Sequence, residues 1–538
     1  MTTRRLMMAA GVAGAVLGAA SARAQLRADE VLLVYDSRLP DSLGVAEVYA
    51  GSARVPGGAG GVVGARPGVR VVDLAALGAP QSNDATITYA QFEAWLREPI
   101  RTYLVSQNLT QRVRCLVLTK GLPHRIEDHQ DTPAAAPVGD DPPGMIAEIQ
   151  ASDATCASVD SELTLLYHDL DVNEAGGQAD SRADGAMLNP YWRLGTPIRL
   201  YPQTNNQAAK TYITRLPGPV YLPSGSGASI LLPGDIMLVV RLDGRSVPDI
   251  ASSLARAGRV YYDTLAHIAT FDESGANGVA DGGPTDELDN AASLLSALRD
   301  ADDYETTRNE LQSDTRFAPT FARYNELLGS TQFFVGPRVA WQPTVITVVE
   351  PVALVTTYGS NHFGLPLTTG GEIARTIYAS SYNYADGAIF NTLESYNGRD
   401  LGGTGQLSFA PQQQIADFIA AGGTFGVASV WEPLADSAPD SRYLARNFLR
   451  GNLSWAEAAW SAIPGLSWQQ IAIGDPLARP LRSSEDITGD RRGTIDDLYA
   501  WEQTPADVDR NGTPNDADRG LVLQMLRSWE RAEMLTGR

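Results

Sequence analysis

The apolar residues of this chain fall into two alternating patterns. Short, mainly aliphatic runs are typical of buried strands, and they occur at residues 31–35, 69–74, 113–119, 235–242, 345–349, 352–357, 387–394, 424–430 and 469–473. Between them lie stretches with helical spacing, at residues 41–50, 88–104, 158–166, 247–257, 289–298, 304–311 and 411–420, and after residue 454. Strands that alternate with helices predict an α/β fold, with one or more mostly parallel sheets flanked by helices.

Three of these helices have a local start signal. Thr88 with Gln91, and Ser454 with Glu457, have the spacing of a capping box, in which two side chains each accept a backbone N–H of the first turn. Asp41 stands where a helix N-cap is expected, because its carboxylate can accept a free N–H. These signals strengthen the helical predictions at 41–50, 88–104 and after 454.

The chain divides into four predicted units, at residues 1–24, 25–245, 246–480 and 484–538. The first is a signal peptide, because two arginines precede an apolar run from Leu6 to Ala20 and Ala22-Arg23-Ala24 has the spacing of a cleavage site. We therefore expect export to the periplasm or the medium. No later run reaches the roughly 18 apolar residues of a membrane helix, so no membrane span is predicted. The second and third units are the two halves of the α/β body.

The net charge limits the classes of molecule that the chain can bind. The 538 residues carry 63 acidic and 42 basic side chains, a net charge of −21. So acidic a chain repels nucleic acid, and it suits calcium, basic partners or neutral polymers. Cys115 and Cys156 allow one disulfide at most. Cys115 lies in an apolar run, where a buried thiol is expected, and whether the two cysteines pair stays open.

Two acidic stretches of twelve residues, 486–497 and 507–518, have the residue pattern of calcium-binding loops. Calcium takes about six or seven oxygen ligands, which a twelve-residue loop provides from positions 1, 3, 5, 7, 9 and 12, with a backbone carbonyl at position 7. Every side-chain position of both stretches carries oxygen. The predicted Ca²⁺ ligands are Asp486, Thr488, Asp490, Arg492 (carbonyl), Thr494 and Asp497, then Asp507, Asp509, Asn511, Thr513 (carbonyl), Asn515 and Asp518. The alternative is a solvated acidic tail.

This tandem of loops resembles a dockerin, a calcium-binding module that attaches secreted bacterial proteins to cohesin-bearing partners. The resemblance covers residues 484–538 and implies a small all-α domain with a cohesin-like or other extracellular protein partner. The chain departs from the pattern at several positions. Arg491 replaces the glycine at position 6 of the first loop, while Gly512 keeps it in the second. Pro514, at position 8, cannot donate the hydrogen bond that joins paired loops. Ile495–Asp496 and Asp516–Ala517 stand where dockerins often present serine and threonine.

The body has a resemblance of its own. The segments VLLVYD, VLTKGLP, SVDSEL, VVRLDG, ADGAIFNTLES, VASVWEP and LSWQQIAIGDPLARP are similar to those of an uncharacterised family of large secreted bacterial proteins. This resemblance covers about residues 28–480 and implies no activity. Residues 246–480 are distantly similar to the caspase-like sheet of the gingipain cysteine peptidases, which bears on the fold alone.

We look for functional side chains directly after the predicted strands, because ligands of parallel sheets bind beyond the carboxyl ends of the strands. The polar side chains there include Asp36, Lys120, His124, Asp243, His362, Glu394 and Glu432. His362 occupies a histidine place of the caspase-like pattern, but no cysteine follows residue 156, so a thiolate nucleophile is missing. A nearby serine such as Ser395 or Ser429 is an open substitute.

Glu394 and Glu432 are the pair that we select for a polysaccharide hydrolase, one as acid and one as nucleophile or base. Composition alone does not favour this hydrolase over the alternative, a non-catalytic scaffold or binding domain with a calcium-binding attachment tail. Whether the protein is an enzyme therefore stays open from the sequence. If the protein is a hydrolase, the two carboxyl groups must lie within about 10 Å of each other.

Overall fold

The computed structural model describes residues 25–126, 157–167, 187–203, 213–215, 221–223, 232–272, 303–325, 333–342, 345–357, 368–370, 374–402, 412–431, 433 and 438–536. The predicted signal peptide, the predicted helix at 289–298, His362, Glu432 and Cys156 lie outside these residues. Cys115 is a buried free thiol, and burial raises its pKa well above the ordinary value.

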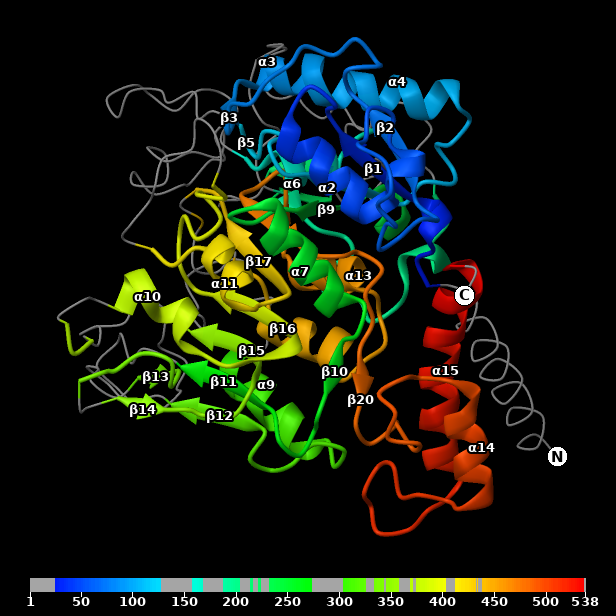
Figure 1. Ribbon diagram of the computed structural model, residues 1–538, viewed down its shortest axis with the longest axis vertical. Coiled ribbons are helices and arrows are strands. Elements are labelled where there is room, and N and C mark those ends of the chain that lie inside the picture. The colour runs from blue at the N-terminus through cyan, green and yellow to red at the C-terminus, as the bar shows by residue number, and fades with distance from the viewer. Residues whose placement is uncertain are drawn as a thin grey trace.

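A ten-stranded sheet forms the centre of the molecule (Figure 1). Its strands, in spatial order, are β12 (Ala322–Asn325), β11 (Ile268–Asp272), β15 (Val352–Thr357), β16 (Tyr384–Thr392), β17 (Phe425–Ser429), β19 (Gln470–Ile473), β9 (Leu238–Leu242), β4 (Cys115–Thr119), β1 (Val31–Tyr35) and β2 (Arg70–Asp73). Eight of the nine strand pairings are parallel, and β17 with β19 is antiparallel. The predicted α/β fold with a mostly parallel sheet is confirmed.

The antiparallel pair reverses the direction of half the sheet. Strand β19 runs parallel to β9, so β2, β1, β4, β9 and β19 share one direction, and β17, β16, β15, β11 and β12 share the opposite one. Within each half, the second strand along the chain lies outside the first and the third lies inside it. This doubly wound order appears as β2-β1-β4-β9 and again as β12-β11-β15-β16-β17. The carboxyl ends of the two halves therefore lie at opposite edges of the sheet.

Helices flank the sheet in two sets of neighbours. One set contains α2 (Pro40–Ala50), α7 (Val247–Ala257), α11 (Ile415–Ala421) and α10 (Ala374–Ser381), which follow one another across the view in Figure 1. The second contains α9 (Asp303–Ser313), α12 (Ser441–Leu444) and α13 (Trp455–Ala462). The remaining body helices are α3 (Tyr89–Phe92), α4 (Glu98–Ser106) and α6 (Val159–Leu163). Turns of π-helix at 93–97 and 445–449 follow α3 and α12.

Small paired strands lie outside the main sheet. Strand β10 (Tyr261–Tyr262) pairs with β20 (Leu481–Arg482), β13 (Phe334–Val335) with β14 (Ile346–Thr347), and β3 (Thr86–Ile87) with β5 (Arg125–Ile126). A four-stranded sheet contains β18 (Gly465–Leu466), β6 (Met187–Leu188), β8 (Tyr221–Pro223) and β7 (Ile213–Arg215). Among the described helices, none combines the length and the apolar character that crossing a bilayer requires.

One hydrophobic core runs through both predicted halves of the body. The same buried cluster contains Leu33 and Val239 from the first half, and Leu354 and Phe425 from the second. Phe425 stacks on Trp455 of α13, with the ring centroids 4.8 Å apart. The sheet and its core are thus continuous across residue 245, where the sequence suggested a boundary.

The predicted elements agree with the structure where the local signal was strong. Helix α7 and strands β1 and β15 have the predicted bounds, and both capping boxes are present, at Thr88–Gln91 and Ser454–Glu457. Two helix starts were wrong, and the strands predicted from residues 113, 235 and 387 begin at Cys115, Leu238 and Tyr384. Helix α2 has Leu39 at its N-cap and Pro40 at N1, and α11 begins at Ile415 instead of residue 411. Strands β11 and β12 were missed.

The last described residues form two helices that pack together. They are α14 (Ile495–Gln503) and α15 (Asp516–Thr536), joined to the body through β20 (Figure 1). Their shared core contains Leu481, Trp501, Val508, Val522, Met525 and Leu526, with Tyr261 of β10 packed against it. The body therefore supplies part of the apolar surface on which these helices rest.

Candidate metal centre and strand ends

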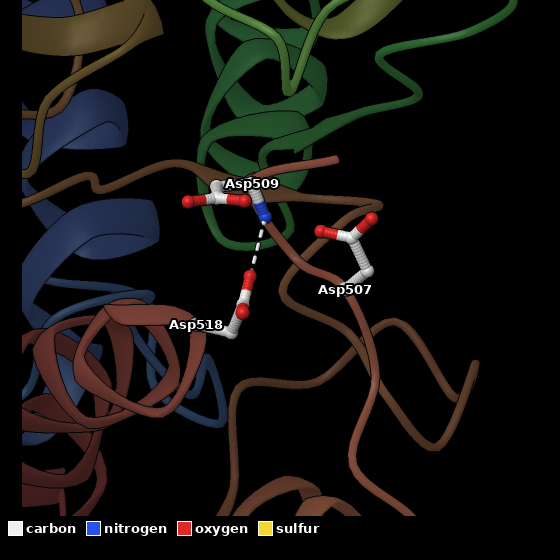
Figure 2. Close-up of side chains that lie close together, drawn as sticks. All are labelled: Asp507, Asp509 and Asp518. Carbon is white, nitrogen blue, oxygen red and sulfur yellow. Dashed lines mark hydrogen bonds between the residues drawn. The ribbon is translucent and has the colours of Figure 1, made fainter. Parts of the chain in front are cut away.

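The second acidic loop brings three carboxylates together. One oxygen from each of Asp507, Asp509 and Asp518 lies within 4.8 Å of the other two. Figure 2 shows these side chains converging, with the backbone N–H of Asp509 donating to Asp518 at 2.8 Å. Oxygen atoms that share one calcium ion at 2.3–2.6 Å must be this close. The spacing of positions 1, 3 and 12 thus places its carboxylates around one point.

The carboxylate at position 12 organises each loop in the same way. In the second loop, Asp518 accepts the N–H groups of Asp509 and Asn515 at 2.8 Å each. In the first loop, Asp497 accepts those of Thr488 and Thr494 at 3.0 and 2.9 Å. Both acceptors are fully buried. Positions 3, 9 and 12 therefore have equivalent places in the two loops.

The carboxylate at position 1 accepts the N–H of position 6 in both loops. Asp507 accepts from Gly512 at 2.7 Å, and Asp486 accepts from Arg491 at 3.0 Å. Burial raises the pKa of Asp486, and the neighbouring carboxylates Asp490 and Asp497 raise it further. A positive ion would relieve the repulsion among these groups.

Position 6 has a left-handed backbone in both loops, with φ of 94° at Gly512 and 61° at Arg491. Glycine adopts this conformation without a steric penalty, whereas another residue pays about 1–2 kcal/mol. The departure at Arg491 therefore leaves the turn intact. Its guanidinium lies over the ring of Tyr261 in the body, 4.9 Å from the centroid.

The second loop also contacts the body through position 4. Arg510 donates to the carbonyl of Arg316 at 2.7 Å and to the Thr264 hydroxyl at 3.1 Å. The hydroxyl of Thr315 donates to the carbonyl of Asp509. Both loops thus contact the same side of the body. The surface of α14 that points away from the body is exposed to solvent. On α14, Ile495 and Tyr499, one turn apart, are 39% and 58% exposed.

The strand ends of the first half form a closed polar cluster. Lys120 donates to the carbonyls of Gly244, Leu401 and Gly402 at 2.7–3.0 Å and lies 3.4 Å from Asp243. Arg241 pairs with Asp160 at 2.7 Å. All of these charged side chains are buried. The hydrogen bonds satisfy Lys120 fully, so this cluster joins strands and loops instead of presenting a reactive group.

The polar strand ends do not share one edge of the sheet, because the two halves of the sheet run in opposite directions. Asp36 is buried at the end of β1 and pairs with Arg38 at 2.6 Å. The loop after β16 starts at the opposite edge and extends to Lys120, which binds the carbonyls of Leu401 and Gly402. One loop therefore connects the two edges.

Glu394, the one residue of the predicted catalytic set that is described, is buried. Its side chain is 3% exposed, and its Oε1 accepts the backbone N–H of Gln413 at 3.2 Å. Its predicted partner Glu432 lies outside the described residues, as does His362. Ser429 is buried in β17.

His124 is buried beside the strand ends of the first half. Its Nε2 lies 2.9 Å from the carbonyl of Arg399. Burial, followed by the charges of Arg125 and Arg241, holds the pKa of His124 well below its ordinary value. The neutral ring therefore donates from Nε2.

Sequence reasoning missed two groups of polar residues. Asp272, at the end of β11, accepts from Asn325 Nδ2 at 2.5 Å and from the N–H of Phe334 at 2.8 Å, and burial raises its pKa to about 7. The short apolar run before it was the available signal. Arg125 and Arg399 both lie against the ring of Trp431. Nothing local pairs residues so distant in the chain.

No family model matches the chain, and no curated protein matches it. The resemblances to a dockerin and to a family of secreted bacterial proteins therefore stay predictions. The function must be argued from the residues themselves.

Proposed function

We propose that residues 484–538 form a small all-α, dockerin-like module that binds calcium and attaches an exported protein to an extracellular partner. The shared hydrogen-bond pattern of the two loops carries this proposal. In both, position 12 accepts from positions 3 and 9, and position 1 accepts from position 6. Export is supported by the predicted signal peptide at residues 1–24.

Calcium has a physical role in such loops. Without an ion, the second loop has three carboxylate oxygens within 4.8 Å of one another, and two of these carboxylates, Asp507 and Asp509, are half-buried. Their mutual repulsion opposes the folded loop, and a divalent cation converts it into attraction. Binding free energy at such a site therefore adds to the stability of the folded segment.

The outward face of α14 is the surface we assign to the partner, which is a cohesin-like or another extracellular protein. Ile495 and Tyr499 give it an apolar, solvent-exposed pair of side chains. Tyrosine is enriched at protein interfaces and among the few residues that supply most of their binding energy. The opposite side of the module is occupied by contacts with the body.

For the body we favour a non-catalytic scaffold. The observation behind this choice is the burial of Glu394, whose carboxylate caps the backbone of Gln413 instead of facing solvent. The alternative is a polysaccharide hydrolase that uses Glu394 and Glu432. That activity requires a Glu394 carboxylate that substrate can reach.

A calcium titration of residues 25–538 tests the module. Calorimetry should show two ions per chain, and the ions should raise the unfolding temperature. D518N should remove one of the two binding events, because it takes one carboxylate charge from the centre of the second loop. D516N is the matched control, since Asp516 is an exposed acid two residues earlier. No heat and no thermal shift at millimolar calcium would contradict the proposal.

A further inference from the structure

Three loops that follow strands of the main sheet meet around one indole ring. Trp431 follows β17, Arg399 follows β16, and Arg125 lies in β5, shortly after β4. The guanidinium carbon of Arg399 lies 4.7 Å from the ring centroid of Trp431, and that of Arg125 lies 5.7 Å from it. Two cations therefore lie against the same aromatic face or edge, in a chain whose net charge is −21.

Arg125 is a buried cation whose hydrogen bonds go to neutral groups. Its side chain is 5% exposed, Nε donates to the Thr86 hydroxyl at 2.8 Å, and Nη1 donates to the carbonyl of Arg399 at 2.5 Å. Among the described residues, no carboxylate lies within ion-pair distance of Arg125. Other buried arginines here have such partners, for example Arg241 with Asp160 at 2.7 Å and Arg482 with Glu485 at 2.8 Å.

The pKa of Arg125 reflects the lack of an opposite charge beside it. Burial lowers its pKa to about 10, and the charge of Arg399 contributes to the lowering. Asp400 acts in the opposite direction, but it is committed to Arg245 at 2.9 Å. A buried charge without an opposite charge is costly. An anion beside the Arg125 guanidinium would offset the cost of burying its charge.

Two neutral groups at the same place also lack partners. The indole N–H of Trp431 is buried and has no acceptor, and Nδ1 of His124 is buried and has no donor. Because His124 donates from Nε2 to Arg399, its Nδ1 has a free lone pair. Buried polar groups are normally hydrogen-bonded. A ligand with oxygen acceptors would satisfy the indole N–H and would also place a negative charge beside Arg125.

The backbone is strained next to these residues. Tyr396 has φ of 58°, and its ring lies 5.2 Å from the guanidinium carbon of Arg399. A tyrosine in this left-handed conformation costs about 1–2 kcal/mol, and such strain is concentrated at binding sites. The turn from Tyr396 to Arg399 holds the guanidinium between two aromatic side chains.

We propose that Arg125, Arg399 and the indole N–H of Trp431 form a binding site for an oxyanion, namely a carboxylate, sulfate or phosphate group. Guanidinium groups bind these anions through paired N–H donors, and a second arginine adds positive charge at the same place. The aromatic rings add stacking surface for whatever carries the anion. This site is independent of the calcium loops, which lie in residues 486–518.

The test uses residues 25–538 with inorganic phosphate, sulfate, galacturonate oligomers and the matching neutral galactose oligomers. Calorimetry should detect binding of one oxyanion per chain, weakened by added salt, and no binding of the neutral sugar. Tighter binding of the galacturonate oligomer would assign the site to an acidic saccharide. Equal or tighter binding of inorganic phosphate or sulfate would assign it to a free anion.

Three variants locate the site. R399Q should raise the dissociation constant of the oxyanion by about tenfold or more, because a charged hydrogen-bond donor is removed. W431F keeps an aromatic ring and removes the N–H, so it should weaken binding severalfold. R256Q is the control, since Arg256 is also a partly buried arginine bound to carbonyls, those of Ile419 and Gly423. No oxyanion binding at millimolar concentration, or equal binding by R399Q and the parent, would overturn the proposal.

Discussion

The guanidinium carbon of Arg491 lies 4.9 Å from the ring centroid of Tyr261. Arg491 occupies the sixth position of an acidic loop, and Tyr261 belongs to β10 in the body. Tyr261 also packs against the core of α14 and α15. Burial and then the charge of Asp486 raise the pKa of Tyr261 to about 12. The body therefore contacts both the apolar core and the acidic loop of the C-terminal segment.

We predict that Arg491→Ala destabilises the chain and that Arg491→Gly does so less. Alanine keeps the left-handed φ of 61° and loses the contact with Tyr261. Glycine also loses the contact but relieves about 1 kcal/mol of backbone strain. Urea unfolding in the presence of a calcium chelator should give the glycine variant a free energy of unfolding about 1 kcal/mol higher than that of the alanine variant.

Gly512→Ala is the control for this prediction. Its added Cβ meets nothing within 4 Å, so the backbone alone determines the effect at φ of 94°. We expect a loss of about 1 kcal/mol. A Gly512→Ala variant as stable as the parent would show that position 6 can change its conformation freely.

Arg479 should hold α15 on the body. It donates to the carbonyl of Ser528 at 2.6 Å and to that of Leu26 at 2.8 Å, and its side chain is 7% exposed. Arg479→Met should cost about 2–3 kcal/mol, because hydrogen bonds from a charged group are lost. Hydrogen exchange of the amides near residues 520–528 should accelerate.

Arg519→Met is the matched control on the same helix. Arg519 pairs with Glu502 at 2.5 Å, and both side chains are more than a third exposed. Such a surface pair contributes little to stability. Equal acceleration of exchange in both variants would contradict the role of Arg479.

Protonation of Asp314 should lower the stability of the chain in acid. Burial alone would raise the pKa of Asp314, but hydrogen bonds and charges of Arg316 and Arg450 lower it to about 2. The unfolded value is about 3.9. The stabilisation is thus complete above about pH 4 and is lost as the pH falls through 2. Asp314→Asn should cost about 2 kcal/mol at pH 7 and much less at pH 2, whereas the exposed Asp41→Asn should cost little at either pH.

Asp272 should act in the opposite direction. Its pKa of about 7 means that the folded chain binds this proton more tightly than the unfolded chain does. Its contribution is present below about pH 4 and is lost as the pH rises through 7. Urea unfolding between pH 5 and 8 should therefore show a decline of a few kcal/mol in the parent that Asp272→Asn lacks. Identical pH slopes in the two proteins would show that Asp272 does not titrate in this range.

The sequence predicted several features that depend on residues close together in the chain. The bounds of α7 and β15 follow from apolar spacing, and the capping boxes at Thr88 and Ser454 follow from side chains three residues apart. The equivalent hydrogen bonds of Asp497 and Asp518 likewise follow from the twelve-residue spacing. Each of these features has its signal within a few neighbouring residues.

Tertiary structure alone decided how distant residues meet. An apolar run predicts a strand but not the direction of its neighbour, so the antiparallel pairing of β17 with β19 could not be foreseen. That pairing separates the strand ends expected to share one rim. The sequence shows that Arg491 departs from the glycine of its loop, but it does not show the contact with Tyr261, which belongs to a remote strand. Arg125 and Arg399 similarly become neighbours only when three loops converge on Trp431. Spacing along the chain specifies hydrogen bonds within a turn, but charge pairing and strand direction depend on which surfaces folding brings together.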